Sequence, residues 1–453
     1  MDREYLLGQE KLHKAIFILT LPATLSALST VIYNIIDTIF IGQCVGDVGI
    51  AAISIYLPIQ MIISASTLLF ASGIGSFISR QLGAKHYEQA EESIGTLFAF
   101  IATLAVILCV LGVSFPKEIV ELFSAEGNII PYATNYARMM FIGTLFFPLC
   151  LASNNVMRSE GSANYSMYGT VISIVSNIIL DYIFIVLLGW GVTGAGLATT
   201  LSKFINFIYI VYYFKFKALL KIRVRYIRYN FHMLRKAIPI GFSTFLNQFT
   251  GSISIVLLNN VLYTLGSTES VAIYGVVYKL TSLIQRSAGG FSRGSQPLIG
   301  YSFGAKNFKR IRESVKFSAI FSSSICLIAT IIMIIFSKDL VSMFTNNPSL
   351  INSCSYVLRI TLLASPLLGV YFLSIAFYRA IGHAKESIIL SMLRRIIFFI
   401  PMLYILPHIF NLGVLGVWIA LPLSNFIASL VAIGFLIKDS RFSKEIASIQ
   451  KTI

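Results

Sequence analysis

Charged residues are scarce in this sequence, and long stretches contain none. Asp, Glu, Lys and Arg together make up 12% of the 453 residues, whereas hydrophobic residues make up 56% and the mean hydropathy is +0.81. Soluble domains carry about 25% charged residues, so the composition predicts a polytopic integral membrane protein. Because one spanning helix takes about 20 residues, the chain has room for about a dozen spans and for no large soluble domain.

The common signatures of redox, metal, nucleotide and catalytic chemistry are also missing. The five cysteines show no CxxC spacing, the five histidines lie far apart, and no GxxxxGK[ST] loop is present. We therefore expect no disulfide framework, no zinc cluster and no cofactor. We find no nucleophile–base pair at a predicted membrane face, so we do not expect an enzyme. A transporter without a phosphate-binding loop would couple to a proton or sodium gradient, or equilibrate its substrate.

Apolar runs alternate with polar breaks along the whole chain and predict twelve spanning helices. The first apolar run lacks a small-residue cleavage site, so we expect it to be a retained helix and not a signal peptide. The predicted spans cover residues 15–42, 49–79, 94–115, 133–157, 166–188, 193–214, 238–265, 271–299, 314–336, 356–378, 387–406 and 412–437.

Most of the lysines and arginines fall on one side of these spans. If the N-terminus is cytoplasmic, the predicted outer loops contain only Lys117 and Lys338, and the segment 215–237 is strongly basic. Positively charged loops stay inside, so both termini are expected in the cytoplasm. Topology explains most of the net charge of +16, and nucleic acid is not an expected partner.

The sequence contains an internal repeat. The segment Gln81–Tyr87 resembles Ser302–Phe308, and the same shift of 221 residues aligns Phe123 with Phe344 and Arg158 with Arg379. Each copy holds six spans, so the copies insert with the same orientation and are expected to form two parallel lobes, related by a pseudo-two-fold axis along the membrane normal, with substrate between them. The predicted parts are an N-lobe (1–214), a basic cytoplasmic linker (215–237), a C-lobe (238–437) and a cytoplasmic tail (438–453).

Only two acids, Asp37 and Asp181, lie well inside predicted spans, both in the N-lobe. An acid at mid-membrane costs about 2.5–3.5 kcal/mol on insertion scales, so a cavity or a partner such as Lys203 must compensate. Ser173, Asn177 and Asp181 recur every four residues and share one helix face. Carboxylate, amide and hydroxyl oxygens suit a small cation, and paired carboxylates can hold a proton, so the sequence leaves proton and sodium open.

Lys279, Arg286 and Arg293 lie seven residues apart along the eighth predicted span. Arg293 can reach the cytoplasmic surface, but Arg286 is placed near mid-membrane. Structural contacts and a role facing a cavity are both open for this residue. A cavity-facing Arg286 would disfavour strictly cationic substrates. Aromatic residues near the acids, including Tyr33, could stack on a flat organic ligand.

With these features, the chain resembles the multidrug and toxic compound extrusion (MATE) family over essentially its full length. The resemblance rests on the two six-span halves, Pro22 in the first span, and the motifs Gly83-Ala84-Lys85, Gly304-Ala305-Lys306 and Gln296-Pro297-Leu298-Ile299-Gly300. Ser302 departs from the asparagine that the family often carries. Asp37 together with Asn177-x-x-x-Asp181 is similar to the DinF/MepA-like branch.

The resemblance implies multidrug efflux by antiport, in which H⁺ or Na⁺ binds the N-lobe while a drug-like, often cationic or aromatic, compound leaves. It implies a helix bend at Pro22 and alternating access, in the plasma membrane of a prokaryotic cell, by a monomer. A flippase for lipid-linked oligosaccharides is the alternative that Lys279 and Arg286 keep open. The implied cation site is Asp37, Asn177, Asp181 and Thr199, and the substrate cavity is assigned to Tyr33, Asn34, Tyr136, Asn154, Lys279 and Arg286.

Overall fold

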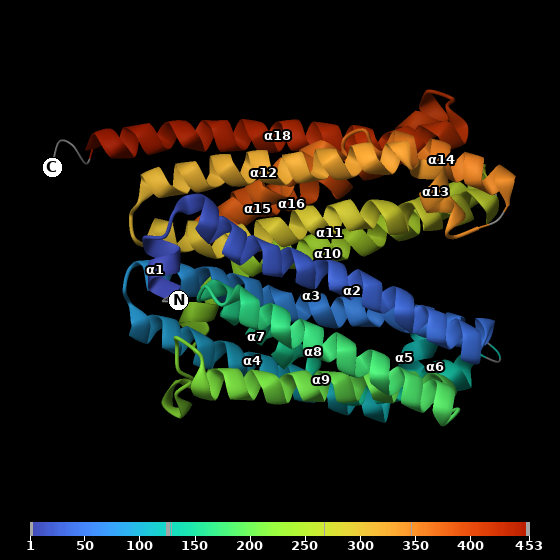
Figure 1. Cartoon of the computed structure of the whole chain (residues 1–453), viewed down its shortest axis with the longest axis horizontal. Helices are drawn as coiled ribbons and strands as arrows, with labels where there is room; N and C mark the ends of the chain where they lie inside the picture. The colour runs from blue at the N-terminus through green and yellow to red at the C-terminus, as the bar shows by residue number, and fades with distance from the viewer. Residues whose placement is uncertain (1–2, 124–126, 128, 267, 346, 450–453) are drawn as a thin grey trace. The chain divides into compact units, whose positions relative to one another are not determined.

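The computed structural model is built from helices along its whole described length (Figure 1). It describes residues 3–123, 127, 129–266, 268–345 and 347–449, without the side chains of residues 34, 35, 38, 47, 268 and 440–449. The helices up to the linker are α1 (Arg3–Gly8), α2 (Leu12–Cys44), α3 (Asp47–Gly83), α4 (Tyr87–Ser114), α5 (Pro116–Leu122), α6 (Ile129–Gly143), α7 (Phe147–Ser159), α8 (Ala163–Asp181), the π-helix η1 (Tyr182–Leu187) and α9 (Gly191–Phe216).

The second half of the chain repeats this order with more interruptions. After the short turn η2 (Val224–Tyr226) come α10 (Phe231–Leu265), α11 (Thr268–Gly304), α12 (Phe308–Ile335), α13 (Ser337–Ser342), α14 (Pro348–Leu362), η3 (Ser365–Leu367), α15 (Leu368–Ile381), α16 (Ala384–Met392), the π-helix η4 (Leu393–Phe399), α17 (Ile400–Tyr404), the π-helix η5 (Ile405–Ile409) and α18 (Gly413–Ile449).

The helices agree with the predicted spans. Within the described residues, nine helical segments are long and apolar enough to cross a membrane. Two bent pairs, α6 with α7 at 45° and α14 with α15 at 43°, raise the number to eleven. The remaining predicted span, 271–299, corresponds to α11, which has 37 residues but carries Lys279, Arg286 and Arg293. The eighth predicted span thus carries three basic residues and is not among the eleven apolar segments of the described residues.

The repeated motifs form identical helix ends. Lys85 and Lys306 both adopt a left-handed conformation, with φ of 61° and 57°. The amides that follow close the same turn, because His86 N donates to Gln81 O and Asn307 N donates to Ser302 O, each at 2.9 Å. This is the usual hydrogen-bond pattern of a left-handed helix C-cap. The sequence repeat is therefore also a structural repeat.

The chain forms two compact units. The first unit comprises residues 1–9 and 25–245, and the second comprises 10–24 and 246–453. Of the three boundaries, one lies between helices and two fall inside α2 and α10; these two are 221 residues apart, which is the repeat distance. The two halves of each of these helices therefore belong to different units.

Small residues allow close helix contacts inside each unit. In the first unit, a Cβ atom on Gly241 would lie 1.6 Å from Leu69 O, and one on Gly73 would lie 2.1 Å from Ala237 O. In the second unit, a Cβ atom on Gly294 would lie 2.5 Å from Thr20 Cα. Packing between membrane helices depends on such close approaches because lipid is as apolar as the side chains.

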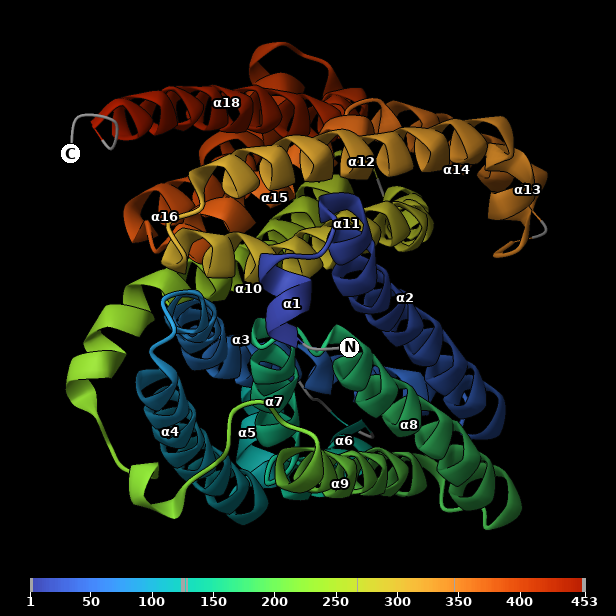
Figure 2. The same cartoon turned by 60° about the vertical axis from the view of Figure 1, so that its left-hand side comes forward.

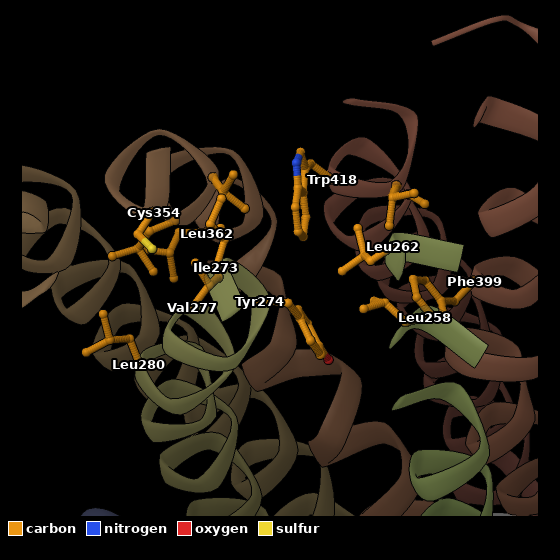
Figure 3. Close-up of a cluster of buried hydrophobic side chains, with 14 of the residues drawn as sticks. Leu258, Leu262, Ile273, Tyr274, Val277, Leu280, Cys354, Leu362, Phe399 and Trp418 are labelled. Atoms are coloured by element: carbon orange, nitrogen blue, oxygen red, sulfur yellow. The ribbon is translucent and has the colours of Figure 1, made fainter. Parts of the chain in front are cut away.

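Each unit also has its own apolar core. In the second unit, buried side chains from α10, α11, α14 and α18 surround Tyr274 and Trp418 (Figure 3). In the first unit, Tyr56, Tyr136 and Phe141 are packed edge to face within the core formed by α2, α3, α6 and α9. Figure 2 shows α8 and α9 side by side in this unit. The contact between these two helices carries the candidate site.

Candidate functional site

The predicted polar face of α8 is buried in the first unit. Ser173, Asn177 and Asp181 are all on the buried side of this helix, and Asp181, its last residue, is fully buried. The π-helix η1 begins directly after Asp181. Such π-bulges are frequent at functional sites, because they interrupt the regular hydrogen-bond ladder.

Asn177 joins Asp181 to α9. With the amide oriented so that both ends meet complementary atoms, its nitrogen donates to Asp181 Oδ2 at 2.9 Å and its oxygen accepts from Thr199 N at 3.3 Å. Asp181 Oδ1 has no hydrogen-bond partner. A buried carboxylate oxygen without a donor is costly, so this atom is available to a proton or a cation.

The second acid reaches the site from α2. Asp37 is 7% exposed, and its Oδ1 atom also has no hydrogen-bond partner among the described side chains, which do not include those of residues 34, 35 and 38. One turn earlier, the Tyr33 hydroxyl lies 3.4 Å from Thr199 Oγ1. The structure therefore brings together Asp37, Asp181 and Thr199 from three helices.

Lys203 on α9 is the basic group beside this cluster. Its Nζ atom donates to Ser173 Oγ at 3.0 Å and lies 5.7 Å from the centre of the Tyr33 ring. In the described part of the chain, no basic group comes within 4.0 Å of either carboxylate. Lys203 therefore lies beside the cluster without a direct ion pair to either acid within the described residues.

A cavity of about 310 Å³ of empty space adjoins the cluster. Thr199 and Lys203 line it, and so do Tyr56, Gln60 and Thr144, which sequence reasoning missed. Tyr136 supports the wall, since its ring packs edge to face on Tyr56 with 5.6 Å between centroids. Gln60, an uncharged polar residue within a long apolar helix, is the sequence signal that could have pointed to this wall.

Three other residues that were predicted to line a substrate cavity do not line this one, and the side chain of a fourth is not described. Asn154 Oδ1 accepts from Ser166 Oγ at 3.2 Å and does not line the cavity. In the second unit, Lys279 Nζ lies 5.8 Å from the centre of the Phe344 ring, and Arg286 is exposed. The side chain of Asn34 is outside the described residues. Pro22 lies inside α2 as predicted.

The second unit contains a larger cavity that the sequence reasoning did not find. It has about 660 Å³ of empty space, its mouth included, and Arg394 and Arg395 line it. Two adjacent arginines inside the predicted span 387–406 were a sequence signal for it, since an arginine in a span is expensive. No cluster of three or more metal-binding side chains occurs among the residues that the structure describes.

Two repeated helical halves, each with a cavity lined by polar and apolar side chains, define a multi-pass membrane transporter. The family model MatE matches residues 22–183 and 239–405. The chain therefore belongs to the MatE family, which confirms the resemblance, and the predicted twelve-helix MATE-type fold class is confirmed with it.

Named relatives and solved structures agree with this membership. The chain is 28% identical to the multidrug export protein MepA of Staphylococcus haemolyticus over 94% of this chain and 93% of the relative. It is 29% identical to MepA of Staphylococcus aureus strain MSSA476 over 97% of both chains. Crystal structures of MATE in the straight and in the bent conformation each match with a TM-score of 0.92 and 25% identity. The match covers 99% of the solved chain in both cases, and it covers 98% of this chain for the straight conformation and 99% for the bent one.

Proposed function

We propose that this chain is a secondary active antiporter that exports drug-like organic compounds, often cationic or aromatic, in exchange for H⁺ or Na⁺. The observation that carries the proposal is the buried pair of Asp37 and Asp181, each with one carboxylate oxygen that lacks a hydrogen-bond partner among the described residues. The relatives named as multidrug export proteins, matched over nearly their full length, support the direction of transport and the kind of substrate.

The acid pair can serve either ion. Two buried carboxylates without a directly paired base repel each other, and a bound proton removes that repulsion. A sodium ion would instead be held by oxygens of Asp37, Asp181 and Thr199, with Asn177 keeping Asp181 in place, since hard cations prefer oxygen ligands. No further cofactor is required in either case.

Ion binding acts on the substrate side through α2 in this proposal. Pro22 removes one helical hydrogen bond and makes a bend inexpensive. It lies within the part of α2 that belongs to the second unit, whereas Asp37 lies in the part that belongs to the first. Loading the site at Asp37 would therefore bias the shape of α2 and expose the site alternately to the two membrane sides. The straight and bent structures of a MATE protein support this step.

Reconstitution into liposomes tests the antiport. A proton gradient without sodium and a sodium gradient without a pH difference are applied separately, and uptake of the fluorescent cation ethidium is measured. We expect one of the two gradients to drive transport. Asp37→Asn and Asp181→Asn should each reduce the driven rate at least about tenfold, because a hydrogen bond to a charged group contributes about 1.5–3 kcal/mol.

The matched control is Asp339→Asn, which removes an exposed acid of α13 and should transport at the wild-type rate. Full driven transport in both site variants would refute the proposed ion site. Transport that neither gradient drives would refute antiport with these ions.

A flippase for lipid-linked oligosaccharides is the second candidate, which the basic residues of the second unit favour. The cavity of the first unit argues against it, because Lys203 is the lone basic residue that lines that cavity. Translocation of a lipid-linked oligosaccharide in the same liposomes, without ethidium transport, would select the flippase.

A further inference from the structure

The large cavity of the second unit is the repeat counterpart of the cavity in the first unit. Under the shift of 221 residues, seven of the ten residues that line the first cavity fall on residues that line the second. The two cavities are therefore built from the same positions of the fold, and their side chains can be compared one by one. Examples of the pairs are Gln60 with Thr281, Thr144 with Ser365, and Lys203 with Ser424.

The comparison shows that the charge of the two cavities differs. Met402 stands at the place of Asp181, so this acid is missing from the second copy. The basic group has also moved to the neighbouring helix, because Arg394 stands at the place of Ser173 and Ser424 at the place of Lys203. Arg395 adds a second guanidinium. The residues that line this cavity include no carboxylate.

Arg394 is buried with open hydrogen-bonding capacity. It is 5% exposed, and its guanidinium lies 5.5 Å from the centre of the Tyr371 ring and 5.2 Å from that of Phe372. Its Nη1 atom makes only long contacts, 3.4 Å to Gln285 Oε1 and 3.5 Å to Asn425 Oδ1. Its Nε–H has no acceptor. The aromatic rings stabilise the charge, and they leave the Nε–H donor of the guanidinium without an acceptor among the described residues.

The guanidinium of Arg395 lies against a glycine, Gly251, whose lack of a side chain leaves room for it. A Cβ atom on Gly251 of α10 would lie 2.8 Å from Arg395 Nη1, so a larger residue there would displace this guanidinium. Neither arginine has a carboxylate within 4.0 Å in the part of the chain that the structure describes. The rest of the wall combines aromatic and apolar groups, such as Tyr274, Tyr278 and Phe399, with hydroxyl and amide groups.

A buried positive charge without an acid partner is expensive, and an anion that accepts from a guanidinium fork compensates it. We propose that this cavity binds an amphipathic organic anion, with its carboxylate, sulfonate or phosphate on Arg394 and Arg395 and its apolar body against the aromatic wall. The proposal goes beyond the proposed function, because it assigns a site of opposite charge in the other unit and does not depend on the acid pair.

Calorimetric titration of the full chain tests the anion site. The protein is placed in nanodiscs of phosphatidylcholine and titrated with 1-naphthalenesulfonate, and separately with 1-naphthylmethylammonium, a cation of similar size. We expect the sulfonate to bind in preference to the cation. Arg394→Gln should weaken sulfonate binding at least about tenfold, since hydrogen bonds between charged groups are the strong ones. Arg394→Lys keeps the positive charge but loses the planar guanidinium donors, so its affinity for the sulfonate should lie between those of the wild type and Arg394→Gln.

Three comparisons make the result specific. Lys309→Gln removes an exposed positive charge outside the cavity and should bind like the wild type. Asp181→Asn should also leave sulfonate binding unchanged, so a failure of the antiport proposal is distinguishable from a failure of this one. Nanodiscs with phosphatidylglycerol identify the source of the anion, because a lipid phosphate that occupies the site would compete with the sulfonate.

Wild-type affinity for the sulfonate in a monodisperse Arg394→Gln variant would overturn the proposal, and so would the absence of sulfonate binding by the wild type in phosphatidylcholine. If Arg394→Gln does not fold, Arg395→Gln provides the same comparison at the partly exposed neighbour, with a loss of affinity expected and wild-type affinity overturning the site.

Discussion

At the scale of single residues, Glu160 lies outside the predicted spans and has a shifted pKa, which makes stability depend on pH. This carboxylate lies between α7 and α8 and is fully buried. It accepts from the Tyr213 hydroxyl and from Leu220 N at 3.1 Å, and it faces Arg3 at 3.4 Å. Burial raises the pKa of Glu160 above its ordinary value of 4.5, although Arg3 and Tyr213 oppose the shift.

We predict that this residue makes the protein less stable as pH rises through the interval between 4.5 and the raised pKa. In that interval the folded state binds more protons at Glu160 than the unfolded state does, so the free energy of unfolding falls as pH increases. Thermal unfolding of the wild type and of Glu160→Gln across mildly acidic pH measures the effect. The variant should show a flatter dependence on pH.

The control for this prediction is Glu118→Gln, which changes an exposed acid of α5 and should keep the wild-type slope. Parallel curves for the wild type and Glu160→Gln would contradict the assignment, since the buried carboxyl would then contribute nothing to the slope.

The residues of the cation site differ in how far the sequence could predict them. Ser173, Asn177 and Asp181 lie four residues apart, so helical geometry alone places them on one face, and the structure buries that face. Lys203 and Ser173 are 30 residues apart, and their hydrogen bond depends on how α8 packs against α9. Arg394 escaped prediction because its environment depends on Tyr371 and Phe372, which precede it on another helix.

At the scale of helices, close backbone contacts at glycine residues stabilise the packing of the first unit. A Cβ atom on Gly241 of α10 would lie 1.6 Å from Leu69 O on α3. We predict that Gly241→Ala forces these helices apart and lowers the free energy of unfolding by about 1–3 kcal/mol, the usual cost of overpacking. Thermal unfolding in detergent, followed by circular dichroism, measures the change.

Gly275→Ala is the matched control in the second unit. This glycine also lies in a helix, α11, but a Cβ atom there would meet nothing within 4 Å. The control should unfold at the wild-type temperature or slightly above it, because alanine favours the helix. Equal losses in both variants would show that the contact with Leu69 does not determine the result.

The helices also show what hydropathy can and cannot predict. Each apolar run corresponds to a helix or a bent helix pair among the described residues, because lipid requires about 20 apolar residues in each span. The helices α4, α10, α12, α14 and α18 extend six to twelve residues beyond the predicted span ends. The breaks at residues 143–147 and 362–365 were not predicted, since α6 with α7 and α14 with α15 are continuous in hydropathy. The π-helices η1, η4 and η5 were also missed, because their hydrogen-bond shift leaves no periodic signal in a short segment.

At the scale of the whole molecule, the basic linker is fixed to one end of α4. Arg223 Nε lies 2.8 Å from Glu91 Oε2, Arg228 Nη2 lies 2.6 Å from Glu92 Oε1, and Tyr226 donates to Glu88 Oε1 at 2.6 Å. The connection between α9 and α10 therefore lies at the same membrane face as the turn between α3 and α4. These two segments were both predicted to be cytoplasmic from their lysines and arginines.

We predict that this face is cytoplasmic in cells and that both termini lie on the cytoplasmic side. The test places single cysteines at Lys309, at the start of α12, and at Lys338, in α13, after replacement of Cys44 and Cys109 by serine. Both lysines are exposed, so the side of the membrane is the main difference in their access to a membrane-impermeant maleimide. Lys338→Cys should react in intact cells, and Lys309→Cys only after permeabilisation, because basic loops are retained inside. The opposite pattern would invert the topology. It would also reverse the direction in which an ion that reaches Asp37 and Asp181 from outside could drive transport.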